Sequence, residues 1–92
     1  MKIIEINNKK YNLITNYKDA FDEEEFLSKC TDYFIDYDYI VGDIAYSKLR
    51  LKGFYKSNNK KANKINDIKT LDDYIANYCS YGAKHFLIKK VK

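Results

Sequence analysis

The chain has 92 residues, of which 46% are hydrophobic and 33% are charged, as is ordinary for one small globular domain. The formal net charge is +4, which is only mildly basic, and no run of about 18 apolar residues predicts a transmembrane helix. The N-terminal apolar run is too short for a signal peptide, and 2 cysteines are too few for a disulfide framework. We therefore expect a single cytoplasmic domain over residues 1–92, with free thiols and no membrane association.

The predicted elements begin with two β-rich runs, KIIEI and YNLIT, joined near Asn7–Asn8, where asparagine tolerates the positive φ of a hairpin turn. A helix is predicted in FDEEEFLSKCTDYF, with Asp22 as N-cap and Glu25 as its reciprocal partner. Phe21 and Phe26 stand at the hydrophobic staple positions around this cap. Helical spacing then predicts one apolar face made of Phe26, Leu27, Cys30, Tyr33 and Phe34.

Two more strands are predicted in DYIVGD and LRLKGFY, with IAYSK between them. The polar stretch KSNNKKANKINDIK has no periodicity and predicts a loop. A second helix follows, with Thr70 and Asp73 as its cap and Gly82 as its C-terminal stop. Its apolar face consists of Leu71, Tyr74, Ile75, Tyr78 and Cys79, and KHFLIKKV is the closing strand.

The resulting order is β(β)αββαβ. Consecutive strands with two amphipathic helices predict an α+β two-layer sandwich, with a mainly antiparallel sheet and both helices on one face. A ferredoxin-like arrangement with an added N-terminal strand fits this order.

Charge is unevenly distributed along the sequence. Between residues 16 and 38 there are eight acids against two lysines: Asp19, Asp22, Glu23, Glu24, Glu25, Asp32, Asp36 and Asp38. Between residues 48 and 69 there are eight bases against Asp67 alone: Lys48, Arg50, Lys52, Lys56, Lys60, Lys61, Lys64 and Lys69. The pattern predicts an acidic helix and a basic hairpin-and-loop region.

The hairpin strand LRLKGFY is the first candidate binding surface. Strand alternation puts Arg50, Lys52 and Phe54 on one face and the leucines on the other. If the helices cover the leucine face, basic and aromatic side chains are left exposed, which suits phosphates and stacked bases. The candidate nucleic-acid-binding residues are Tyr46, Lys48, Arg50, Lys52, Phe54, Lys60, Lys61 and Lys64. The alternative is an ordinary solvated sheet face whose lysines serve solubility.

The remaining candidates indicate structure more than chemistry. Gly42 and Asp43 stand where a strand is expected to end. Asp43 then forms a turn, or alternatively orients Arg50 or Lys48. His85 is placed with Leu87 by strand alternation, and no nucleophile is tied to it by spacing. The sequence has no metal-ligand spacing, phosphate loop or dinucleotide fingerprint, so we predict no metal, no cofactor and no enzymatic activity.

The motif VGD…Y…LRLKGF between Val41 and Phe54, together with EEEF and LDDYIANYCSYG, resembles the YutD-like family of small proteins from low-GC Gram-positive bacteria. The resemblance runs nearly end to end. Relatives commonly carry Trp-Gly at the positions of Ile44 and Ala45, and a second cysteine at the position of Ala83. The resemblance implies a compact full-length domain in the cytoplasm and leaves the activity open.

From these observations we predict a small non-enzymatic binding module that contacts RNA or a ribonucleoprotein through its basic hairpin and loop. The alternative is a protein-interaction adaptor or regulatory protein without nucleic-acid binding.

Overall fold

The computed structural model describes residues 2–6, 9–30, 32–45, 47–78 and 84–91. The expected turn at Asn7–Asn8, Tyr46, Cys79 and the stop at Gly82 lie outside the described residues. Within the described part, no helix has the length and apolar character needed to cross a bilayer.

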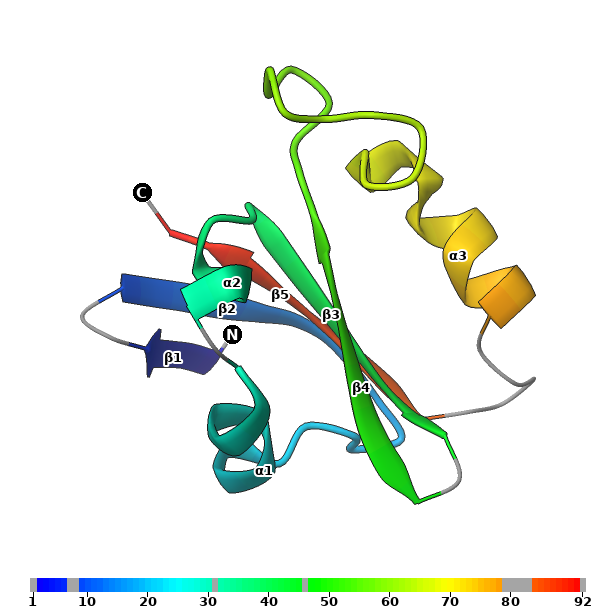
Figure 1. Cartoon of the computed structure of the whole chain (residues 1–92). Helices are drawn as coiled ribbons and strands as arrows, with labels where there is room; N and C mark the ends of the chain where they lie inside the picture. The colour runs from blue at the N-terminus through cyan, green and yellow to red at the C-terminus, as the bar shows by residue number, and fades with distance from the viewer. Residues whose placement is uncertain (1, 7–8, 31, 46, 79–83, 92) are drawn as a thin grey trace.

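The described strands form one antiparallel sheet (Figure 1). These strands are β1 (Lys2–Ile6), β2 (Lys9–Tyr17), β3 (Tyr39–Ala45), β4 (Lys48–Phe54) and β5 (His85–Lys90). Their order across the sheet is β1-β2-β5-β3-β4, so the last strand of the chain lies in the middle. Each neighbouring pair is antiparallel, which confirms the predicted α+β class with an antiparallel sheet.

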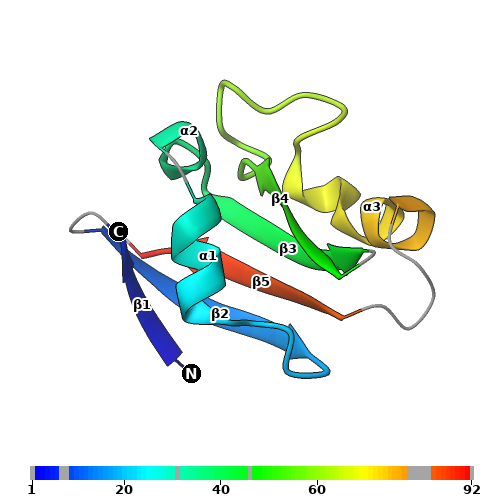
Figure 2. The same ribbon diagram turned by 60° about the horizontal axis from the view of Figure 1, so that its bottom comes forward.

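Helix α1 (Glu23–Lys29) covers one face of this sheet, which we call the α1 side (Figure 2). Its start is the predicted one, because the Asp22 carboxylate accepts a hydrogen bond from the Glu25 backbone N–H at 3.2 Å. The rings of Phe21 and Phe26 lie 5.5 Å apart, as the staple requires. Phe26 packs edge-on against Phe86 of β5, and both are fully buried. The rest of this core includes Ile4, Tyr11, Ile40, Leu49 and Ile88.

The predicted first helix is interrupted. Cys30 adopts an extended backbone at the end of α1, and a separate short helix, α2 (Asp32–Ile35), follows. The expectation of one continuous apolar face is therefore wrong for Leu27 and Tyr33, which are 42% and 66% exposed.

Helix α3 (Leu71–Tyr78) lies on the opposite face, which we call the α3 side. It follows directly on a 3-10 turn, η1 (Ile68–Thr70), whose N-cap is Asp67, and the Thr70 hydroxyl donates a hydrogen bond to the Asp67 carbonyl. Ile40 and Phe86 face the α1 side, so strand alternation points their neighbours Val41 and Leu87 to the α3 side. There they line one hollow together with Leu71 and Ile75 of α3. The prediction that both helices lie on one face is therefore wrong, and so is the ferredoxin-like arrangement that it implied. The sheet and α1 form the two layers of the sandwich, and α3 covers part of the other face.

Gly42 lies inside β3 and not at a strand end. A Cβ atom at this position would lie 2.1 Å from Cζ of Phe86, so only glycine lets the Phe86 ring cross over β3. The strand continues to Ala45, which places Asp43 in the middle of a buried strand as well.

Candidate binding face of the sheet

The basic strand has the alternation that its sequence predicts, but its surroundings differ. Leu49 is buried toward α1, and Arg50, Lys52 and Phe54 point to the α3 side. Phe54 is fully buried there, because the Tyr74 ring of α3 packs edge-on against it at 5.7 Å between centroids. The exposed position expected for Phe54 is therefore wrong, and this ring is not accessible for stacking on a base.

Lys52 is also engaged by α3. Its Nζ atom lies 5.1 Å from the centroid of the Phe54 ring and 5.7 Å from that of Tyr74. A cation over two rings gains cation–π attraction and becomes half-buried. Lys48 remains exposed on the same side of β4.

Arg50 holds a buried carboxylate. Asp43 is 1% exposed, and its Oδ2 atom accepts hydrogen bonds from Nε of Arg50 at 3.1 Å and from Nη2 at 2.5 Å. The Oδ1 atom of Asp43 has no hydrogen-bond partner within the described part of the chain. Asp43 is therefore the partner of Arg50, as the alternative interpretation had it, and not a turn residue. The pairing offsets the cost of burying the charge.

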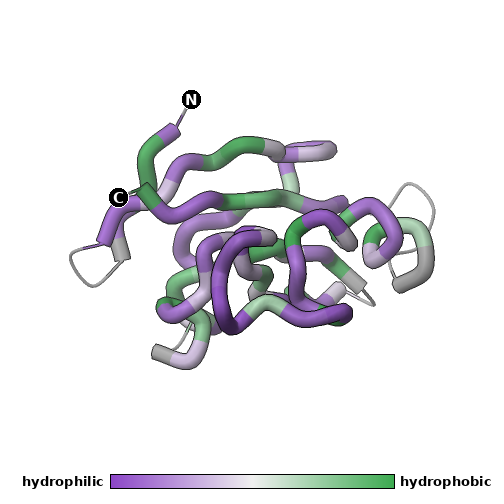
Figure 3. Tube along the Cα trace, turned by 90° about the horizontal axis from the view of Figure 1, so that it is seen from above, coloured by the Kyte–Doolittle hydropathy of each residue, from purple (hydrophilic) through white to green (hydrophobic). Residues whose placement is uncertain are grey.

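The segment after β4 is a loop, as predicted, and side-chain hydrogen bonds hold it in place. Asp38 Oδ2 accepts from the Lys56 N–H at 2.9 Å and from the Asn59 side chain at 3.0 Å. The buried carboxylate of Asp67 accepts from Ser57 Oγ at 2.6 Å. Figure 3 shows that this loop is hydrophilic along most of its course. Its polar residues thus serve to hold the loop in place.

One lysine predicted to attract nucleic acid in this loop forms an ion pair. Lys61 Nζ donates to both oxygens of Asp36, at 3.0 and 2.9 Å, and Tyr55 Oη donates to Asp36 Oδ2 at 2.6 Å. These hydrogen bonds lower the pKa of Asp36, and the bond to Asp36 raises the pKa of Tyr55. Lys60 and Lys64 are exposed. Their part in binding stays a prediction, as does that of Tyr46.

Four polar side chains form a row across the α3 side. Backbone register pairs Tyr17 of β2 with His85 of β5, His85 with Asp43 of β3, and Asp43 with Arg50 of β4. We call this set the polar row. Its first two members stack, with ring centroids 5.0 Å apart and planes 25° apart. The row therefore links a half-exposed tyrosine at one end to a buried ion pair at the other.

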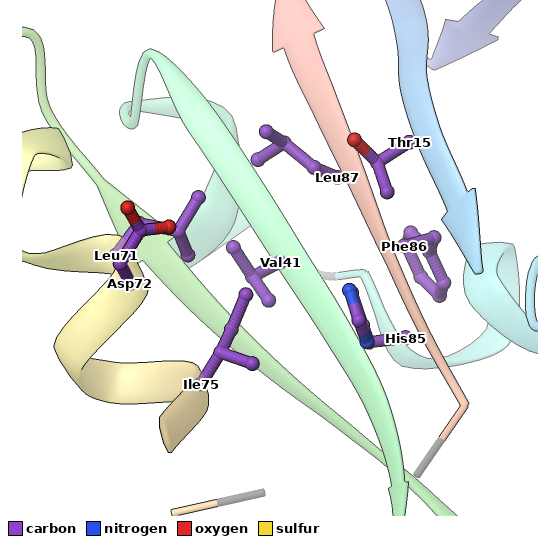
Figure 4. A pocket seen from close by; sticks show the side chains of 8 residues that line it. All are labelled: Thr15, Val41, Leu71, Asp72, Ile75, His85, Phe86 and Leu87. Carbon is purple, nitrogen blue, oxygen red and sulfur yellow. The ribbon is translucent and has the colours of Figure 1, made fainter. Parts of the chain in front are cut away.

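Next to this row, a notch opens between α3 and the sheet (Figure 4). It has a volume of about 190 Å³. Its walls are mostly apolar side chains from α3, β3 and β5, with a few polar groups: Thr15, Val41, Leu71, Asp72, Ile75, His85, Phe86 and Leu87. Concave apolar sites with a few polar groups are typical of binding sites.

Beyond the notch, the β1–β2 half of the α3 side presents apolar surface. Ile3 and Tyr17 are 54% and 43% exposed, and strand alternation points both to this side, since Ile4 and Phe86 face the α1 core. Within the described residues, α3 is the helix that packs on this face, over β3 and β4. The α3 side is therefore partly covered, whereas the α1 side is closed.

The sequence did not identify this face as a site. Alternation in HFLIKK placed His85 with Leu87 correctly, and the apolar face of α3 included Leu71 and Ile75. Thr15 and Tyr17 come from β2, about 70 residues before their neighbours on β5. A pairing between such distant segments has no local signal in one sequence. A register shift between Leu13 and Thr15 also reverses the two faces of β2, so strict alternation from the buried Tyr11 would have placed Tyr17 on the wrong side.

Comparison with known proteins gives consistent matches. A family model described as "Putative antitoxin YutD-like" matches residues 5–89. The chain is 44% identical over 90 residues to "Putative antitoxin YutD" of Bacillus subtilis (strain 168), over 98% of this chain and 99% of the relative. The solution NMR structure of protein yutD from B. subtilis superposes with a TM-score of 0.83 at 43% identity. That match covers 100% of this chain and 84% of the other.

Proposed function

The chain belongs to the YutD-like family, and from this premise we propose that it is a small non-enzymatic binding module whose partner is a protein, engaged through the α3 side of the sheet. In this proposal the whole chain acts as one domain in the cytoplasm. The word antitoxin in the relative's name fits a protein that acts by binding and neutralising another macromolecule.

The observation that carries the proposal is the notch together with the half-exposed tyrosine beside it. Protein interfaces are centred on aromatic and apolar groups that fill pockets, with polar groups at the rim. Tyr17, Ile3 and the notch provide such a centre on one continuous face.

A protein partner accounts for this surface better than RNA does. Phe54 is buried, Arg50 is paired with Asp43 and Lys61 with Asp36, so three of the expected RNA contacts have partners within the chain. Sequence-tolerant RNA binding requires accessible rings and cations. The notch and the exposed side chains of Tyr17 and Ile3 offer a shaped apolar surface instead.

The test is to express the tagged chain in B. subtilis, the organism of its relative, to purify it with and without ribonuclease treatment, and to compare Tyr17→Ser with Leu27→Ser. These residues are 43% and 42% exposed on opposite sides of the sheet, so both changes remove a similar surface group. We expect one protein to copurify in constant ratio after ribonuclease treatment and to be lost with Tyr17→Ser alone.

An RNA function predicts the opposite pattern. Copurifying material would then disappear with ribonuclease treatment. A short labelled RNA would bind in fluorescence anisotropy, with an affinity that falls steeply as salt rises. That result, unchanged by Tyr17→Ser and weakened by Lys48→Ala, would overturn the proposal.

A further inference from the structure

Basic side chains surround the open half of the α3 side. Lys10 of β2 points to this side, since its neighbour Tyr11 faces the α1 core. Lys89 of β5 lies on the same side, with its Nζ atom 5.8 Å from the centroid of the Tyr39 ring. Lys18 places its Nζ atom 5.4 Å from the centroid of the Tyr17 ring. These three lysines form the rim of the exposed apolar surface.

The strands of this side carry mostly positive charge over their whole width. The bases that strand position assigns to it are Lys10, Lys48, Arg50, Lys52 and Lys89, against Glu5 and Asp43. The acids Glu23, Glu24 and Glu25 lie on α1, which covers the other face. The strands of the α3 side therefore carry a net positive charge, and long-range attraction favours an acidic molecule over their open half.

The helix wall of the notch carries the opposite charge. Asp72, exposed in the first turn of α3, lines the notch, and Asp73 follows it. An acidic partner must therefore direct its carboxylates toward the β2 and β5 lysines and away from α3. This constraint requires a partner whose acidic and apolar groups lie on different sides, as they do in an amphipathic helix.

From this arrangement we infer that the α3 side binds an acidic amphipathic helix of a partner protein, with one apolar side chain in the notch and carboxylates against Lys10 and Lys89. The inference rests on the proposed function and adds the chemistry of the partner. Helix-in-groove binding relies on a few apolar anchors at helical spacing, and the notch accepts such an anchor beside Tyr17. The lysine rim then sets the charge preference.

Two synthetic amphipathic peptides with the same leucine positions, one with glutamate and one with lysine at all polar positions, test the inference. Binding is measured by fluorescence anisotropy and mapped by the amide NMR shifts of the full chain. We expect the acidic peptide to bind at least about fivefold more tightly than the basic one, since rim charges contribute modestly. The shifts should be at Thr15, Tyr17, His85 and Leu87.

A double variant, Lys10→Glu with Lys89→Glu, removes the positive charge of the rim. The single variant Lys9→Glu is its control. Lys9 is next to Lys10 but points to the α1 side, where Tyr11 also lies. The double variant should lose the preference for the acidic peptide, and Lys9→Glu should keep it. Circular dichroism of each variant confirms that the fold is retained.

Three results would overturn the inference: equal binding of both peptides, shifts centred on α1, or the same loss with Lys9→Glu. The inference would also fail if the free chain associates with itself and the double variant Lys10→Glu/Lys89→Glu does not. The occupant of the α3 side would then be the acidic α1 of a second copy. If the two peptides bind equally but a protein that copurifies with the wild type is still lost with Tyr17→Ser, the proposed protein-binding function stands. Only the inferred preference for an acidic helix is then wrong.

Discussion

The two sides of the sheet are built from the same strands and serve different purposes. On the α1 side, each of the five strands contributes a buried residue to one core cluster that includes Phe26, and these side chains are excluded from solvent. On the α3 side, the helix covers Val41 and Phe54 but leaves Tyr17, Ile3 and a notch. The α1 side therefore holds the main core of this small domain, and the α3 side keeps exposed apolar surface, which is the surface proposed to bind a partner.

The largest expected effect is on the closed side. Phe26→Ala should lower the free energy of unfolding by about 3–5 kcal/mol, because the fully buried ring leaves a cavity against Phe86. Ile75→Ala, in the wall of the notch, should cost about 1–2 kcal/mol because the side chain is only half-buried. Urea unfolding of both variants measures the difference. Equal losses would remove the distinction between the two sides.

A second change tests how closely the closed side is packed. Gly42→Ala should cost about 1–3 kcal/mol, because the new methyl group would lie within 2.1 Å of Phe86. The same substitution in a Phe86→Leu background should cost less, since the smaller side chain leaves room for the methyl group. A double-mutant cycle by urea unfolding gives the interaction energy. An interaction energy of zero would mean that Phe86 does not require the glycine.

The buried ion pair of the α3 side should be stabilising only as a pair. Arg50→Met should cost about 1–3 kcal/mol, because Asp43 is then buried without a partner for either oxygen. Asp43→Val with Arg50→Met should recover most of the loss, as apolar replacements of buried pairs often do. Lys48→Met on the same strand is the control and should be close to neutral in thermal unfolding. A large loss of stability in Lys48→Met, or no regained stability in the double variant, would contradict this account.

The smallest effect concerns the loop after β4. The hydrogen bond from Lys61 lowers the pKa of Asp36 in the folded chain, so its contribution to stability is present above the unfolded pKa and is lost as pH falls through the folded pKa. Lys61→Met should raise the pKa of Asp36 toward its usual value. The variant should then lose less stability than the wild type on acidification below about pH 4. Carboxyl NMR titration and urea midpoints at two pH values measure both. An unchanged pKa would show that Tyr55 alone holds this carboxylate.

The closed side could be predicted largely from the sequence because its signals are local. The cap at Asp22, the staple of Phe21 and Phe26, and the alternation of Leu49 with Arg50 each involve neighbours along the chain. The face on which α3 packs is decided by contacts between distant segments, such as Tyr74 with Phe54. Without that contact, the alternation of the basic strand predicted an exposed Phe54.

The proposed binding face was less predictable for the same reason. The polar row requires the register of four strands, and β5 reaches the middle of the sheet only after the rest of the chain has been placed. The sequence placed Arg50 on the correct side and listed Asp43 as its possible partner, and the structure joins them. Nothing local connected either residue to Tyr17 or to the notch.

The central claim is that binding takes place on the α3 side and not on the α1 side. Its most direct test places a photo-reactive phenylalanine analogue at position 17 or position 27 of the full chain, expressed in living cells of B. subtilis, the organism of its relative. The two positions are 43% and 42% exposed, so differences in access do not decide the outcome. We predict a protein adduct of one defined mass from position 17 and none from position 27. Adducts from position 27 alone, or equal adducts from both, would contradict the claim.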